Sequence, residues 1–167
     1  MVEILKNSFR FVLLISLQVL VFNRIDISEF LSPMVIVGFI LFLPFTSYKW
    51  LLLVSSFFLG LFVDLFMNTP GIVSFTAALI AYLRPAILRV LQPRDGYAIN
   101  SSPTVLDLGW NWFFQYSIFL TFIFHLVYFV ILGFSQDNFL IMLWKAIISS
   151  AFTLLFLLIY QLLSINK

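Results

Sequence analysis

Long apolar runs separated by short polar stretches make up most of the chain. A helix that crosses a membrane needs roughly 20 apolar residues, each rising about 1.5 Å. The pattern predicts six transmembrane helices, over residues 8–23, 33–45, 50–67, 72–91, 110–133 and 139–163. The second is short for a span, because Pro33 opens it and Pro44 ends it. It could stand nearly upright, begin earlier near Ile27, or fail to cross.

Composition places the chain in a membrane rather than in water. Hydrophobic residues make up 63% of the 167 residues and charged residues 10%, against about 25% charged in soluble domains. We therefore expect an all-α membrane protein, with one six-helix transmembrane domain over residues 1–167 and no separate soluble domain. The absence of cysteine excludes disulfides and thiolate chemistry.

Lys and Arg predict the orientation, because they are enriched in the cytoplasmic loops of multi-pass proteins. With six spans, one side of the membrane holds seven basic residues and the other holds two. Both termini are therefore predicted to be cytoplasmic. The larger set is Lys6, Arg10, Lys49, Arg84, Arg89, Arg94 and Lys167, and the smaller is Arg24 and Lys145.

Small side chains and one acid share a face of the third predicted helix. Ser56, Gly60 and Asp64 follow each other at spacings of four residues, which places them on one side of a helix. A pair of small residues at this spacing lets two membrane helices approach closely. The turn 68–71 comes next, where Asn68 or Thr69 is expected to cap the fourth helix. The expected helix-packing residues are Ser56, Gly60, Gly71, Ala77 and Ala81.

Depth along the helices indicates which polar side chains can meet. Rises of about 1.5 Å per residue put Asp64 about one turn from the outer end of the third helix and Arg84 about 18 Å from the outer end of the fourth, in its inner half. The two are therefore not paired. His125 and Lys145 match the depth of Asp64. An ion pair with Lys145 would offset the cost of placing Asp64 in the membrane. We expect an outer polar cluster of Asp64, His125 and Lys145, with Thr121 or Tyr128 beside His125, and favour a structural tie over a ligand site.

The basic residues of the fourth helix form a second candidate group, Arg84, Pro85, Arg89 and Arg94. Arg84 is expected to face protein in the inner half, where it would meet Gln115, Tyr116 or carbonyls at a helix end. Pro85 should kink the helix. Together, Arg84, Arg89 and Arg94 could hold anionic lipid headgroups or an acidic partner at the cytoplasmic side. The usual enrichment of cytoplasmic loops in Lys and Arg explains them more simply. The loop 92–109 is long enough to be either functional or disordered.

Motifs for membrane catalysis are missing from the sequence. The single His cannot form a multi-histidine metal site. No second acid matches the depth of Asp64, and neither a Gly-x-Ser-x-Gly site nor a phosphate loop occurs. We therefore expect no catalytic residue, metal or cofactor, and no nucleic-acid partner. A lipid-modifying enzyme is the least favoured class.

Three short stretches in the middle of the chain form a recognisable set. They are Gly60-Leu61-Phe62-Val63-Asp64-Leu65-Phe66, the turn Thr69-Pro70-Gly71, and Ala81-Tyr82-Leu83-Arg84-Pro85. Together they resemble the MreD family of rod shape-determining membrane proteins. The chain length, the six-helix hydropathy and the loop Arg94-Asp95-Gly96-Tyr97 agree with this family. The motifs cover about residues 60–97, and the hydropathy covers the whole chain. The resemblance implies a fold similar to the substrate-binding subunits of energy-coupling-factor vitamin transporters.

The same resemblance implies a non-catalytic subunit of the bacterial cell-elongation complex, or elongasome. Such a subunit lies in the inner membrane, binds the single-helix protein MreC and supports peptidoglycan synthesis and cell shape. MreB filaments, RodA and a class B penicillin-binding protein are expected in the same complex, with membrane lipids around it. The alternative is the vitamin-binding subunit of a transporter. In that case Asp64, His125 and Lys145 could line its polar pocket. Its docking surface should be rich in Ala, and Ala77, Ala78 and Ala81 match that pattern only weakly.

Overall fold

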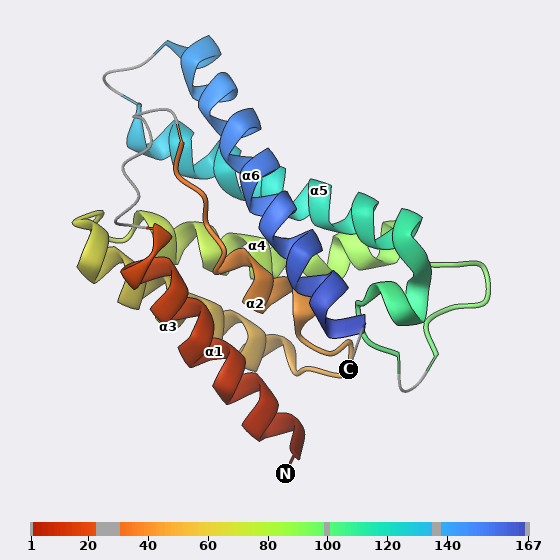
Figure 1. Ribbon diagram of the computed structural model, residues 1–167. Coiled ribbons are helices and arrows are strands. Elements are labelled where there is room, and N and C mark those ends of the chain that lie inside the picture. The colour runs from red at the N-terminus through yellow and green to blue at the C-terminus, as the bar shows by residue number, and fades with distance from the viewer. Residues whose placement is uncertain (1, 23–30, 99–100, 135–137, 166–167) are drawn as a thin grey trace.

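The computed structural model describes residues 2–22, 31–98, 101–134 and 138–165 (Figure 1). Within these ranges the chain is all-helical. The helices are α1 (Val2–Leu20), α2 (Val37–Phe42), α3 (Lys49–Met67), α4 (Ile72–Val90), α5 (Val105–Leu132) and α6 (Phe139–Ile165). Four of them, α3 to α6, are long and apolar enough to cross a membrane. The fold is therefore consistent with a multi-pass membrane protein.

The long helices lie close to where the hydropathy pattern places them. The predicted ranges 50–67 and 72–91 differ from α3 and α4 by one residue at a single end. Helix α5 begins at Val105, but Gly109 has φ 81° and ψ 166°, which interrupts the helix there. Only glycine adopts this conformation readily. The continuous part of α5 therefore begins near Trp110, as predicted.

The predicted helix over residues 33–45 is much shorter in the structure. Residues 31–34 are extended, a turn follows, and only Val37–Phe42 forms a helix. We call residues 31–43 the central segment. Its extended part rises about 13 Å and the helix Val37–Phe42 about 9 Å, so together they cover most of a hydrocarbon layer of about 30 Å. Every residue from Met34 to Leu43 is buried, and Figure 1 shows this orange stretch running across the bundle.

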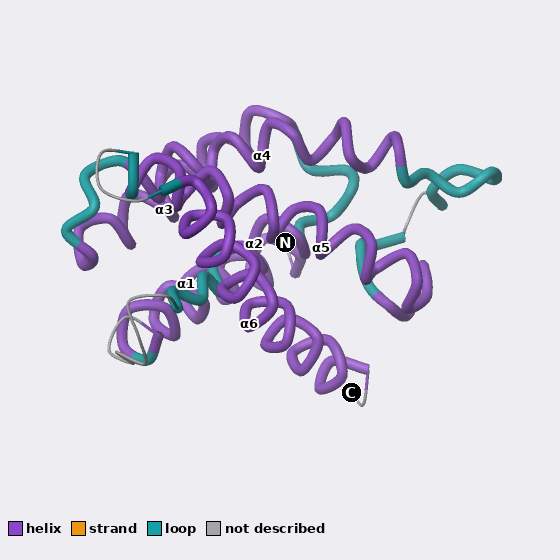
Figure 2. The backbone as a smooth tube through the Cα atoms, turned by 90° about the horizontal axis from the view of Figure 1, so that it is seen from above, coloured by secondary structure: helices purple, strands orange, loops and turns teal. Residues whose placement is uncertain are grey.

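Two helical hairpins surround the central segment. Helix α3 packs mainly against α4, α5 against α6, and α4 joins the two hairpins through α5. Helix α1 contacts α3 and α2. The start of α1, the end of α6 and the chain between α4 and α5 lie towards one end of the bundle, and the α3–α4 turn lies towards the other (Figures 1 and 2). The side of the membrane on which each end lies stays a prediction, and Arg24 and Lys167 of the charge count fall outside the described residues.

Candidate functional site

The carboxylate of Asp64 closes the turn between α3 and α4. It accepts hydrogen bonds from the Thr69 hydroxyl and from the backbone N–H groups of Val73 and Ser74, each at 2.9 Å. The two amides belong to the first turn of α4, whose N–H groups have no partner within the helix. A negative charge is also favourable at this end of a helix. Asp64, with Thr69, Val73 and Ser74, is called the Asp64 tie below.

The Asp64 tie corrects the prediction that Asn68 or Thr69 caps α4. Asn68 instead ends α3 in the left-handed conformation, with φ 52°. The N-cap position of α4 is Gly71, which has φ 84° and no capping side chain of its own. Asp64 does the capping from the preceding helix, and Thr69 supports it by donating to the carboxylate.

Close backbone contact accompanies the Asp64 tie. A Cβ atom on Gly60 would lie 2.4 Å from the Cα of Ser74 and 2.8 Å from the carbonyl oxygen of Val73. Both distances are far inside van der Waals contact, so only glycine fits. Ser56, Ala77 and Ala81 are buried as well, which agrees with their expected packing role. Gly71 differs, because it is exposed and a Cβ there would meet nothing within 4 Å. Its role is in the turn, not in packing.

The predicted cluster of Asp64, His125 and Lys145 does not form. Within the described residues, no hydrogen bond or ion pair joins Asp64 to either of the other two. Lys145 is half-buried on α6. Tyr128 lies close enough to Asp64 to interact with its charge. The carboxylate takes its hydrogen bonds from the Thr69 hydroxyl and from the first turn of α4.

His125 belongs to a different hydrogen-bond chain. Its Nδ1–H donates to the Thr121 carbonyl at 2.8 Å, which leaves Nε2 as an acceptor for the Thr153 hydroxyl at 3.2 Å. The same hydroxyl oxygen accepts from the backbone N–H of Met34 at 3.0 Å. The expected proximity of Thr121 to His125 is therefore confirmed. The histidine is fully buried, and it connects α5 to α6 and to the central segment.

Polar side chains hold the extended half of the central segment from both sides. Non-helical backbone is tolerated at membrane depth only where protein or water satisfies its polar groups. Here α1 and α6 supply the partners. The bonds run from Ser32 N–H to Ser149 Oγ (3.1 Å), from Met34 N–H to Thr153 Oγ1 (3.0 Å), from Val35 N–H to Gln18 Oε1 (2.9 Å), and from Gln18 Nε2 to the Pro33 carbonyl (3.1 Å).

Arg84 holds the other end of the central segment. Its Nε donates to the Tyr116 hydroxyl at 2.7 Å, and its Nη2 donates to the Leu43 carbonyl. Tyr116 in turn donates to the Leu41 carbonyl at 3.2 Å. These carbonyls end α2, where the helix dipole favours a positive charge. The expectation that Arg84 meets Tyr116 and helix-end carbonyls, and not Asp64, is confirmed.

The rest of the basic motif lies at the surface. Pro85 sits inside α4 without ending it, while Arg89 and Arg94 are exposed. Just beyond, Tyr97 folds back on α4 and donates to the Leu88 carbonyl at 2.7 Å. Burial raises the pKa of Tyr97, so its hydroxyl stays protonated and able to donate. This part of the 92–109 loop is anchored to the bundle.

Sequence reasoning missed the role of Gln18, Ser149 and Thr153. The available signal was the spacing in α6, where Ala146, Ser149 and Thr153 share one helix face and are all fully buried. Small and polar residues on one face of a membrane helix mark the side that contacts protein. No pattern in the sequence indicated that residues 31–36 would be non-helical.

Most of these buried polar groups bond to each other or to the backbone, although Ser56 Oγ has no hydrogen-bond partner. The Thr153 hydroxyl donates to His125 Nε2, as a nucleophile would to a base, but both side chains are fully buried. Among the described residues there is no group of three His, Asp or Glu that could hold a metal.

A hollow of about 270 Å³ lies between α1 and α6, over the central segment. Its walls are mainly aliphatic and aromatic: Leu14, Leu17, Val21, Phe22, Val35, Phe42, Phe156, Leu157 and Tyr160. Comparisons with protein-family models, curated proteins and solved structures find no match for this chain.

Proposed function

We propose that this chain is a non-catalytic, multi-pass subunit of the bacterial cell-elongation complex and that it binds the membrane helix of MreC. The resemblance of residues 60–97 to the MreD family motivates this role. MreB filaments, RodA and a class B penicillin-binding protein would share the complex. In this role the chain lies in the inner membrane with both termini in the cytoplasm.

The residues that carry the resemblance support a scaffold. Gly60 and Asp64 join α3 to α4, and Arg84 joins α4 to the central segment and to Tyr116 on α5. All three are engaged inside the protein, where they set the positions of helices. This arrangement suits a rigid framework whose outer surface binds other membrane helices.

The hollow between α1 and α6 carries the proposal. It lies between α1 and α6 and is lined mainly by apolar side chains, among them Leu17, Phe42 and Leu157. Helices associate in membranes through close packing of such surfaces. A site for a polar vitamin would instead need several convergent polar groups, and among the described residues that line this hollow only Tyr160 has a polar side-chain group. We therefore assign the hollow to a single apolar helix of the partner.

The absence of cysteine allows a direct test. Leu17→Cys places one thiol beside the hollow, and Leu65→Cys places one on the exposed face of α3, away from the hollow. Each variant is expressed with MreC that carries single cysteines along its membrane helix, and the membranes are oxidised. Leu17→Cys should form a disulfide-linked pair and Leu65→Cys should not.

Two results would separate the parts of the proposal. If MreC co-purifies in equal amount but crosslinks no better through Leu17→Cys than through Leu65→Cys, the role stands and the hollow is the wrong surface. If the chain purifies with a bound vitamin and without MreC, the role itself is wrong and the transporter alternative replaces it.

A further inference from the structure

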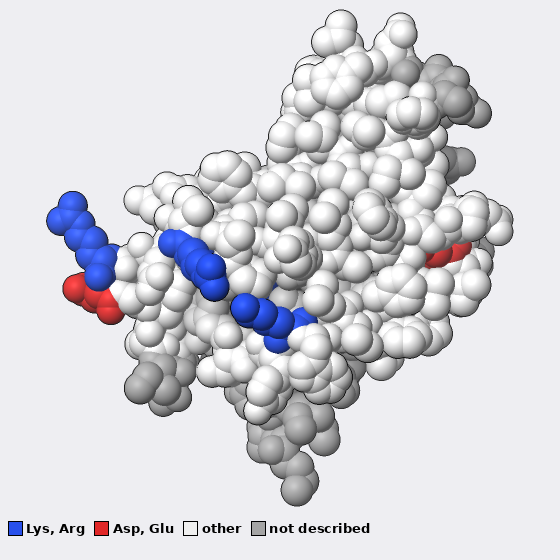
Figure 3. Space-filling model, turned by 180° about the vertical axis from the view of Figure 1, so that it is seen from behind, with Lys and Arg blue, Asp and Glu red and all other residues white. Residues whose placement is uncertain are grey.

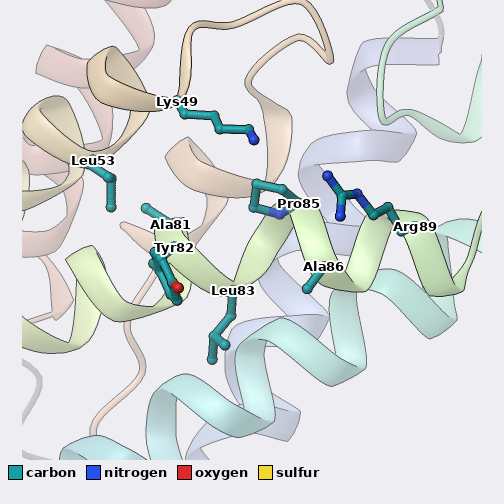
Figure 4. A pocket seen from close by; sticks show the side chains of 8 residues that line it. All are labelled: Lys49, Leu53, Ala81, Tyr82, Leu83, Pro85, Ala86 and Arg89. Carbon is teal, nitrogen blue, oxygen red and sulfur yellow. The ribbon is translucent and has the colours of Figure 1, made fainter.

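A groove of about 300 Å³ lies between the start of α3 and the last two turns of α4. Lys49 is the first residue of α3, and Arg89 is in the last turn of α4. Figure 4 shows the Lys49 amine and the Arg89 guanidinium pointing toward each other across Pro85. The small side chains of Ala81 and Ala86 leave the space between the helices open.

The positive charge in this groove has no counter-charge among the described residues. No acidic side chain lines it, and within the described part of the chain nothing forms an ion pair or hydrogen bond with Lys49 or Arg89. Helix α3 also has no capping side chain at its N-terminus, so the amides of its first turn add partial positive charge. Figure 3 shows basic side chains near the middle of this face with no acidic side chain beside them. An anion would be attracted here.

The groove becomes apolar as it runs away from the two cations. Leu53 lies one helical turn along α3 from Lys49, about 6 Å. On α4, Tyr82 lies about 10 Å from Arg89 in the same direction. Leu53, Tyr82 and Leu83 line this part, and Tyr82 is 69% exposed. The groove thus has a charged end at the edge of the span and an apolar floor within it.

We propose that this groove binds one anionic phospholipid. The phosphate lies between Lys49 and Arg89, and one acyl chain follows Leu53 and Leu83 toward the middle of the bundle. Basic pockets between membrane helices suit such headgroups, and the guanidinium fork can donate two hydrogen bonds to phosphate. This site does not depend on MreC, so it stands apart from the proposed function.

Lipid binding to the purified chain tests the site. The full chain in a neutral detergent is titrated with phosphatidylglycerol and, separately, with phosphatidylcholine, and native mass spectrometry counts the bound lipid. We expect one tightly bound phosphatidylglycerol and no comparable phosphatidylcholine. Lys49→Gln or Arg89→Gln should weaken binding roughly fivefold, and the double variant about 30-fold.

Matched variants distinguish a site from general charge attraction. Arg94→Gln removes the same charge from an exposed residue outside the groove, and it should leave binding unchanged. Arg89→Lys keeps the charge and should retain most of the affinity. Equal losses in Arg94→Gln and Arg89→Gln would overturn the proposal.

The chemistry of the ligand is tested with soluble anions. Inorganic phosphate and glycerol phosphate lack acyl chains, so they should bind far more weakly than the lipid. If either binds as tightly as phosphatidylglycerol, the assignment to a phospholipid is wrong. Circular dichroism of each variant shows that the fold is retained.

Discussion

The Asp64 tie and the central segment both place polar groups in an apolar interior, but their partners come from very different distances along the chain. Asp64 bonds to groups five, nine and ten residues away. Met34 bonds to Thr153, 119 residues away, and Arg84 to Leu43, 41 residues away. The Asp64 tie therefore stabilises one hairpin, whereas the central segment requires α1, α4, α5 and α6 to assemble around it.

The largest expected effect comes from comparing one glycine in each region, Gly60 beside the Asp64 tie and Gly38 in the central segment. The two differ in what an added Cβ atom would meet. Gly60→Ala would drive a Cβ into the backbone of Ser74 at 2.4 Å, and backbone cannot move without disturbing the Asp64 tie. Overpacking of this kind should lower the free energy of unfolding by about 3 kcal/mol. Thermal unfolding in detergent, followed by circular dichroism, measures the loss.

Gly38 in the central segment is the matched control. A Cβ there would approach the Leu157 side chain at 2.7 Å, and the end of a leucine side chain can rotate away. Gly38→Ala should lower the free energy of unfolding by about 1 kcal/mol or less. If Gly38→Ala destabilises as much as Gly60→Ala, the Asp64 hairpin is not the more tightly packed region.

The next effect concerns the carboxylate of the Asp64 tie. Asp64→Ala leaves the amides of Val73 and Ser74 buried without an acceptor, which should lower the free energy of unfolding by about 2–3 kcal/mol. Asp64→Asn keeps one acceptor oxygen and should lose about half as much. The same thermal unfolding measures both variants. If Asp64→Ala leaves stability unchanged but weakens MreC binding, Asp64 contacts the partner and does not stabilise the hairpin.

The smallest effect tests the central segment through one hydroxyl. Thr153→Val keeps the side-chain shape but removes the acceptor for Met34 and the donor for His125, so it should lower the free energy of unfolding by about 1–2 kcal/mol. Thr121→Val is the control. Its hydroxyl bonds only to carbonyls of its own helix, which keep their helical N–H partners, and its loss should be under about 0.5 kcal/mol. Equal losses would show that Thr153 does not support the central segment.

The sequence predicts the long helices and the inward role of Arg84 well. Apolar runs bounded by turn residues are sufficient to place α3 and α4. The constant rise of a helix puts Arg84 opposite Tyr116, and the two side chains do form a hydrogen bond. Position along the helix is enough to predict a contact when few polar side chains lie at the same depth.

Two features depend on information that the sequence does not present directly. Depth alone cannot say which helices are neighbours, so Lys145 and His125 matched the level of Asp64 without sharing its surroundings. The conformation of the central segment was not predicted, because an apolar run indicates a helix by hydropathy alone. Hydropathy does not show whether side chains of distant helices bond to the backbone in place of helical hydrogen bonds. Ser149 and Thr153 make the extended conformation possible, and they lie four helices away along the chain.

Because the ribosome makes the chain from its N-terminus, the two regions can form their hydrogen bonds at different times. Asp64, Val73 and Ser74 emerge almost together, so the α3–α4 hairpin can close its bonds as soon as it enters the membrane. The amides of Ser32 and Met34 emerge 117 and 119 residues before their acceptors on α6. Until then, water or the insertion machinery must accept their hydrogen bonds. One of the first stretches to be synthesised is therefore among the last to reach its final place.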